Sequence, residues 1–287
     1  MKEPKPIIHI DEVDYIYPTK TMALDKISLR INKGELIAIM GQNGAGKTTL
    51  IRTLNGLIRP TNGNVYVKGE NNSTKSIAEL SKIIGIIFQN PMHQLFSNSI
   101  EEELKFSLKN LEFTKEQIQQ KVDAILTKFN FEKYRDRSPF NLSGGEAKKL
   151  ALATIICRDP EILVFDEPTL GQDAKEIDFF LEIIKNELEK DKTILMVTHN
   201  IEFAFENIPR TILMANGKIL ADGPTEQVLT NNFLVNKASL ILPQIHQFKL
   251  GLEKIGIEVP NEIFKQRDMI SFIDNYLKIK LANRLGE

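Results

Sequence analysis

Four short, unbroken runs of apolar residues stand out along the first two thirds of the chain. Such runs, which do not alternate with polar residues, are typical of strands that are buried on both faces of a sheet. They are Leu36 to Met40, Ile83 to Phe88, Ile162 to Phe165 and Ile194 to Val197.

Other segments show different patterns of apolar and polar residues. Ile7 to Tyr17 and Ala23 to Ile31 alternate apolar and polar residues, which predicts strands with one buried face. Apolar positions recur with helical spacing from Glu116 to Tyr134 and again from Ile177 to Leu188. The dipeptide Asn216-Gly217 predicts a hairpin turn. Together these patterns predict an α/β fold.

The pattern also suggests how the chain is divided. A helical block at about residues 93–155 lies between two strand-rich halves, so we expect it to be an inserted subdomain of a domain spanning residues 1–224. After Asp222-Gly223-Pro224 the pattern becomes helical, with breaks at Pro243 and Pro260. Residues 225–287 therefore form a predicted C-terminal helical extension.

Composition limits the possible functions. The formal net charge is −1, so no overall basic field favours nucleic acid as a partner. The single cysteine, Cys157, excludes an internal disulfide and lies in an apolar run, which favours a core residue over a nucleophile. No apolar stretch approaches the ~20 residues that cross a bilayer. We therefore expect any link to a membrane to be peripheral or through a partner.

The first candidate for chemistry follows the first buried run directly. Residues Gly41 to Thr48 read GQNGAGKT, which fits the pattern G-x-x-x-x-G-K-[ST] between a strand and a helix. Glycines allow successive N–H groups to point at one phosphate chain, and the helix that follows adds the positive end of its dipole. Lys47 can reach the terminal phosphates, and the Thr48 hydroxyl can bind Mg²⁺. The sequence therefore predicts a nucleoside triphosphate site.

Polar side chains follow the other three buried runs. Gln89 ends one, Asp166 and Glu167 end the next, and His199 follows the last. Taken alone, each could be an ordinary residue at a strand end. Because parallel strands deliver their carboxyl ends to one edge of a sheet, we expect all of them beside the phosphate loop. There Asp166 can hold Mg²⁺ through water, and Glu167 can orient or deprotonate the attacking water.

A further segment, Leu142 to Glu146, reads LSGGE and precedes an apolar helix. Ser143 and Glu146 have the spacing of a capping box, which is the purely structural interpretation. The two glycines between them are poor helix formers, and the capping box does not explain them. They would let a phosphate approach bare N–H groups at the start of a helix, and we favour that interpretation.

The order of these motifs resembles that of the ATP-binding cassette (ABC) ATPases. An LSGG segment after a helical insert separates this family from other P-loop NTPases, although here Glu146 stands where glutamine is commoner. The resemblance covers about residues 7–224. It implies a RecA-like P-loop NTPase core with an antiparallel β edge. It also implies ATP and Mg²⁺ as cofactors, and a head-to-tail dimer that closes on two ATP molecules and is reopened by hydrolysis.

The same resemblance assigns roles to single residues. Tyr17 would stack on adenine, Glu167 would be the general base, and Lys47 and His199 would complete the catalytic group. Thr48, Gln89 and Asp166 would bind or support Mg²⁺. Ser143, Gly144 and Gly145 would contact the ATP of the opposite subunit, and Asp173 would help communication across the dimer. The remaining nucleotide contacts would come from Gly41, Gln42, Asn43, Gly44, Ala45, Gly46 and Thr49.

A narrower resemblance is to the ATPases of energy-coupling factor (ECF) transporters. It rests on the segment from Phe88 to Phe106, on Glu167 to Asp173, and on Leu242 to Ile245. It implies a second ATPase subunit, identical or related, a transmembrane coupling protein gripped around Asn90 to Lys105, and a small substrate-binding membrane protein. The cargo would be a vitamin or a transition-metal ion, and the chain would lie at the cytoplasmic face of the cell membrane.

Two other functions stay open. One is the ATPase of a conventional ABC transporter; the other is a soluble ABC ATPase that acts in DNA repair or translation. The chain shows neither a long coiled-coil insertion nor a second cassette, and it has no basic face for nucleic acid. The sequence leaves undecided which cargo is carried, which of two sister ATPases this is, and what the C-terminal extension does.

Overall fold

A six-stranded sheet forms the centre of the molecule in the computed structural model, which describes residues 5–90, 94–260 and 262–285. The strand order is β10-β9-β3-β8-β7-β6, with β9, β3, β8, β7 and β6 parallel and β10 antiparallel to β9. The α/β prediction and the predicted hairpin at Asn216-Gly217 are thus confirmed. The strands are β3 (Leu36–Met40), β6 (Ile84–Ile87), β7 (Ile162–Asp166), β8 (Thr193–Val197), β9 (Arg210–Ala215) and β10 (Lys218–Pro224).

A second, antiparallel sheet accounts for the alternating N-terminal pattern. Its order is β2-β1-β4-β5, with the strands β1 (Ile8–Ile16), β2 (Met22–Ile31), β4 (Asn62–Val67) and β5 (Glu70–Asn71). Because side chains alternate along β3, Ile37 and Ile39 enter the core shared with this sheet, while Ala38 and Met40 enter the core on the other side. The helix α1 (Lys47–Leu54) belongs to the first of these cores.

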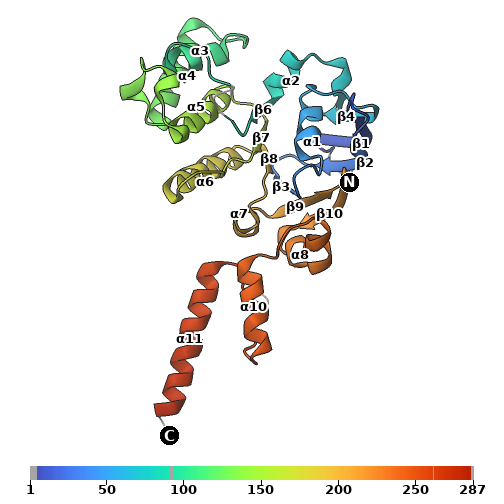
Figure 1. Ribbon diagram of the computed structural model, residues 1–287. Helices are drawn as coiled ribbons and strands as arrows, with labels where there is room; N and C mark the ends of the chain where they lie inside the picture. Colours follow the sequence, from blue (N-terminus) through green and yellow to red (C-terminus); the bar gives the residue numbers. More distant parts are fainter. Residues whose placement is uncertain (1–4, 91–93, 261, 286–287) are drawn as a thin grey trace.

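The helical block between β6 and β7 gathers away from the antiparallel sheet (Figure 1). It contains α3 (Ile100–Leu108), α4 (Lys115–Lys128) and α5 (Gly144–Cys157). The helix predicted from Glu116 to Tyr134 is too long: α4 ends at Lys128, Asn130 has a left-handed φ of 58°, and Glu132–Tyr134 form a separate 3₁₀ turn. A short helix before β6, α2 (Ile77–Ile83), was not expected from the pattern.

The remaining helices follow β7, β8 and β10 in the chain. After β7 and β8 come α6 (Ala174–Leu188) and α7 (Ile201–Asn207). The C-terminal extension is helical, as predicted, and consists of α8 (Thr225–Thr230), α9 (Asn232–Lys237), α10 (Gln244–Lys254) and α11 (Gln266–Leu285). The helices α10 and α11 project from the sheet side by side and share a small core of Leu252, Val259 and Met269 (Figure 1). Within the described ranges, no helix combines the length and the apolar character needed to cross a bilayer.

Candidate functional site

The phosphate loop connects β3 to α1, and its glycines are required by close backbone contacts. Gly41 has a φ of 142°, and a Cβ there would lie 2.0 Å from the carbonyl oxygen of Met214 in β9. Gly46 has a φ of 101°, and its Cβ would lie 2.5 Å from the carbonyl oxygen of Ala23. Side chains rarely adopt such φ values, so the loop keeps its path only with glycine at both positions.

Lys47 is the first residue of α1, and its side chain folds back over the loop. Its Nζ donates hydrogen bonds to the carbonyl oxygens of Gly41 at 2.7 Å and Gln42 at 2.9 Å. Burial lowers the pKa of Lys47, while the charges of Glu167 and Asp166 act in the opposite direction. The ammonium group is therefore held at the centre of the loop, facing two carboxylates across the site.

The predicted convergence at one sheet edge is present in the geometry. A cavity of about 740 Å³ is bordered by the phosphate loop from Gly41 to Thr49, by Tyr17, and by the side chains that end the parallel strands. Those side chains are Gln89 after β6, Asp166 and Glu167 at the end of β7, and His199 after β8. The hydroxyl oxygen of Tyr17 lies 2.9 Å from Thr49 Oγ1, which ties this ring to the first turn of α1.

Oxygen donors of the kind that Mg²⁺ prefers stand together in this cavity. Burial raises the pKa of Asp166, and the charge of Glu167 raises it further, while Arg52, Lys47 and a hydrogen bond with Thr48 lower it. Within the described part of the chain no cluster of three or more histidine, cysteine or acidic side chains could hold a metal ion by itself. The hydroxyl of Thr48, the amide of Gln89 and the carboxylate of Asp166 are oxygen ligands that would suit a hydrated Mg²⁺.

Glu167 and His199 form a direct pair across β7 and β8. The Nδ1 atom of His199 lies 2.8 Å from Glu167 Oε2, and the backbone N–H of His199 donates to the same oxygen at 3.3 Å. Glu167 is buried and has a left-handed φ of 53°, a conformation that costs energy for a residue with a side chain. The backbone N–H of Glu167 donates a hydrogen bond to the carbonyl oxygen of Val197 at 2.9 Å. A strained, anchored carboxylate beside the phosphate loop is a candidate base.

Comparison with known proteins decides the family. The sequence profile described as "ABC transporter" matches residues 24–170, which is just over half of the chain. The chain belongs to the ABC transporter family. This membership confirms the predicted ABC-type ATPase and the predicted P-loop fold.

Two curated relatives are similar to this ABC protein over most of its length. It is 34% identical over 266 residues to the energy-coupling factor transporter ATP-binding protein EcfA2 of Clostridium tetani, covering 90% of this chain and 92% of that protein. It is 38% identical over 268 residues to an ABC protein of Methanosarcina acetivorans, covering 93% of this chain. The chain spans only 44% of the length of that second relative. The predicted likeness to ECF-type ATPases is confirmed.

Two solved structures share the fold. One is cbiO1 from Clostridium perfringens, described as part of the ABC transporter complex cbiONQ; it has a TM-score of 0.72 at 30% identity and covers 85% of this chain and 98% of its own. The other is an ATP-binding cassette dimer in a post-hydrolysis state with ADP and Pi. Its TM-score is 0.69 at 26% identity, covering 76% of this chain and 98% of its own. Nucleotide binding is thus a property of the family to which this ABC protein belongs.

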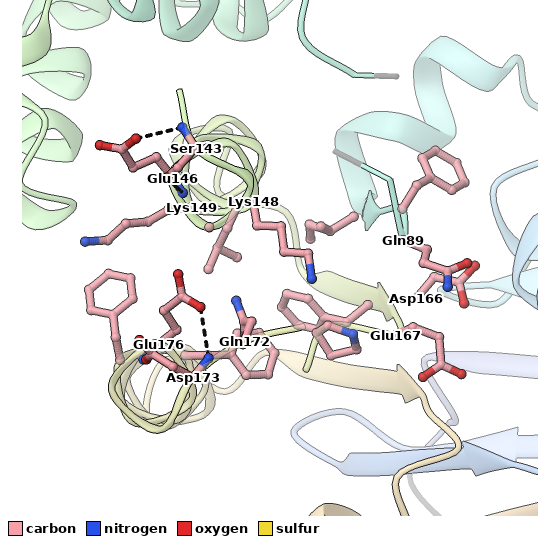
Figure 2. Close-up of a pocket in the computed structure, with 18 of the residues that line it drawn as sticks. Gln89, Ser143, Glu146, Lys148, Lys149, Asp166, Glu167, Gln172, Asp173 and Glu176 are labelled. Carbon is pink, nitrogen blue, oxygen red and sulfur yellow. Dashed lines mark hydrogen bonds between the residues drawn. The ribbon is translucent and has the colours of Figure 1, made fainter. Parts of the chain in front are cut away.

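The signature segment of this ABC protein, Leu142 to Glu146, does not border the nucleotide cavity. Ser143 caps α5 and forms the predicted capping box with Glu146. Ser143 and Gly145 instead line a second cavity of about 310 Å³ between α5 and α6, which Gln89, Asp166 and Glu167 also border (Figure 2). The capping box is confirmed, and the favoured contact between this segment and a phosphate stays a prediction.

Several residues of the site were not foreseen. Thr21 to Ala23, at the start of β2, and Ser239 to Ile241, between α9 and α10, border the nucleotide cavity beside the phosphate loop. Ser239 to Ile241 belong to the C-terminal extension, nearly 200 residues away in the sequence. No local pattern distinguishes them, so only the folded chain reveals their place. Cys157, in contrast, is buried in the core as predicted, and burial raises its pKa to about 12.

The segment expected to grip a membrane partner, around Asn90 to Lys105, is only partly visible, since residues 91–93 lie outside the described residues. The next part of it is anchored by Glu103 in the first turns of α3. Glu103 is buried, and it accepts hydrogen bonds at 2.8 Å from the backbone N–H groups of Phe96 and Ser97. The aromatic rings of Phe96 and Phe106 pack edge to face, and both remain exposed.

Proposed function

We propose that this chain is the ATP-hydrolysing subunit that energises an ECF-type ABC importer of a vitamin or a transition-metal ion. It works as a head-to-tail dimer with a second ATPase subunit, identical or related, and two ATP molecules lie between the subunits. Residues 1–224 form the nucleotide-binding domain, with the helical subdomain inserted at about 93–155, and residues 225–287 are the extension. The chain acts at the cytoplasmic face of the cell membrane.

One observation carries this proposal: the nucleotide cavity of one chain holds every predicted catalytic side chain but not the signature segment. Lys47, Glu167 and His199 lie with the phosphate loop, whereas Ser143 and Gly145 border the other cavity. A second subunit that presents its own signature segment would complete the site. The dimeric relative with ADP and Pi supports this arrangement.

Each side chain then has a defined task in the hydrolysis of ATP to ADP and phosphate. Lys47 and the N–H groups of the phosphate loop bind the phosphates, and Tyr17 supports the adenine ring. Thr48, Gln89 and Asp166 would hold Mg²⁺, which supplies charge neutralisation at the phosphate oxygens. Glu167 orients the attacking water and accepts its proton, and His199, 2.8 Å from that carboxylate, positions it and reaches the terminal phosphate.

The link to transport rests on the relatives and on one surface. Relatives named as ECF transporter ATP-binding proteins cover most of this chain. The exposed ring of Phe96 lies seven residues after Gln89 in the sequence and packs against the exposed ring of Phe106. A transmembrane coupling protein that docks on these rings would sense changes at Gln89, which borders the nucleotide cavity. A small substrate-binding membrane protein would select the cargo.

Purification from membranes tests this proposal. A tagged copy of the chain is expressed in the organism that naturally makes it. The membranes are then solubilised, and the proteins that co-purify with the tagged chain are identified. We expect two small membrane proteins, together with a second ATPase if the other subunit is not a further copy of this chain. The smaller membrane protein names the cargo. Recovery of the transmembrane domains of a conventional ABC transporter, in place of the two small membrane proteins, would contradict the ECF assignment. Recovery of ribosomes or nucleic acid would contradict transport itself.

A further inference from the structure

The carboxylate of Glu176 lies between the first turns of α5 and α6. Within α6 its Oε2 atom accepts a hydrogen bond from the backbone N–H of Asp173 at 3.1 Å, and its own N–H donates to Asp173 Oδ1 at 2.9 Å. This reciprocal pair is a capping box. The capping box accounts for the position of Oε2 but gives no partner to the other carboxylate oxygen, Oε1.

The second oxygen faces the signature segment. A Cβ on Gly145 would lie only 1.8 Å from Glu176 Oε1, whereas a Cβ on the neighbouring Gly144 would meet nothing within 4 Å. Gly145 has no left-handed φ, so its backbone does not require glycine. Figure 2 shows the Glu176 side chain pointing from α6 towards α5. Gly145 therefore leaves space for this carboxylate.

Two further contacts join the same helices. Lys148 Nζ donates a hydrogen bond to the carbonyl oxygen of Leu170, in the loop before α6, and Lys149 Nζ lies 4.3 Å from the ring centroid of Phe179. Burial lowers the pKa of both lysines, and the negative charge of Glu176 acts in the opposite direction. The positive ends of two helix dipoles also meet at this carboxylate, which offsets their repulsion.

We infer that Glu176 is a positioning residue that holds the signature segment and the loop at residues 170–173 together as one unit. This inference rests on the proposed function, because both segments would act on the ATP bound by the opposite subunit. A linked unit presents Ser143 and Asp173 to that ATP in a fixed relation. Loosening the link leaves each segment folded but no longer aligned with the other.

Hydrogen exchange of the full, nucleotide-free chain tests the link directly. In Glu176→Ala we expect amides in both peptides, 143–150 and 170–176, to exchange roughly fivefold to tenfold faster, as loss of a helix cap and its contact predicts. Glu176→Gln should lie between the wild type and Glu176→Ala, since glutamine fills the same place in a capping box but carries no negative charge to offset the two helix dipoles. Asp178→Ala removes an exposed carboxylate from the same helix and serves as the matched control.

The outcomes separate positioning from simple capping. Faster exchange confined to 170–176 would overturn the inference, because Glu176 would then only cap α6. Unchanged exchange in Glu176→Ala, or equal loss in Glu176→Gln, would overturn it too. In the purified complex, Glu176→Ala should also lower kcat about tenfold with little change in KM for ATP, as expected for lost transition-state alignment. A wild-type complex without ATPase activity would refute the proposed function alone, since exchange is measured without nucleotide.

Discussion

Replacing Glu187 by glutamine should destabilise the protein strongly at neutral pH. Glu187 lies in α6 with a fully buried side chain, and its carboxylate meets the ammonium groups of Lys190 at 2.8 Å, Lys192 at 2.8 Å and Lys128 at 3.4 Å. Lys128 belongs to α4, so the cluster joins the helical insert to the sheet-bearing core. Removing one partner of a buried ion pair costs about 3–5 kcal/mol.

The lower end of that range applies here. Lys192 is the only buried lysine of the three, and it keeps Asp159 as a second partner. Lys190 and Lys128 are partly exposed and can turn towards water. We therefore expect Glu187→Gln to lower the free energy of unfolding by about 3 kcal/mol at pH 7. Glu182→Gln, an exposed position on the same helix, should change it by less than about 0.5 kcal/mol.

The effect should depend on pH in a defined direction. Burial alone would raise the pKa of Glu187, but the hydrogen bonds and charges of Lys190 and Lys192 outweigh it, so the pKa lies below its ordinary value of 4.5. A lowered pKa gives stability that is complete above the unfolded value and is lost as the pH falls through the folded value. The difference between wild type and Glu187→Gln should therefore be full at pH 7 and shrink below about pH 4.5.

Urea unfolding at several pH values measures both quantities. The double variant Glu187→Met with Lys192→Met should recover much of the loss, because a packed apolar pair replaces a buried ion pair at little cost. A Glu187→Gln variant within about 0.5 kcal/mol of the wild type at pH 7 would refute the reasoning. A difference that grows as the pH falls would refute the assigned direction of the pKa shift.

Two further predictions concern the nucleotide site. Gly41→Ala places a methyl group against the Met214 carbonyl and should lower the free energy of unfolding by about 1–3 kcal/mol, measured by thermal unfolding. The control Gly251→Ala, in open space on α10, should be neutral or slightly stabilising. Equal melting temperatures for the two variants would contradict this prediction. Tyr17→Ala should weaken ATP binding roughly tenfold by calorimetry through loss of ring stacking, and Tyr17→Phe should bind within about threefold of the wild type. An equally weak Tyr17→Phe would instead show that the hydroxyl bond to Thr49 matters, not the ring.

Local patterns were enough to predict the sheet edge. The run Leu36 to Met40 and the strand β3 coincide residue for residue, because a strand buried on both faces reads as a continuous apolar run. The polar residues at the ends of β6, β7 and β8 follow from the same logic, since parallel strands end at one edge. The cavity that holds them together was therefore predictable without any tertiary information.

Other features depend on contacts between distant segments. The apolar spacing continued past Lys128, but the chain leaves the helix at Asn130, a residue that tolerates the left-handed conformation. The burial of Glu103 depends on N–H groups of Phe96 and Ser97 that no periodicity reveals. The approach of Ile241 to the phosphate loop likewise depends on how the extension packs against the sheet.

The most direct measurement is the turnover of ATP by the purified complex with Glu167→Gln in this chain. Loss of a general base typically costs about 10²–10⁴ in rate, and glutamine keeps the size of the side chain. We predict that kcat falls at least about a hundredfold while the Kd for ATP stays within about threefold and the ATP-bound dimer persists. A variant that still hydrolyses ATP within tenfold of the wild-type rate would contradict the assignment of Glu167 as the base and, with it, the account of the site.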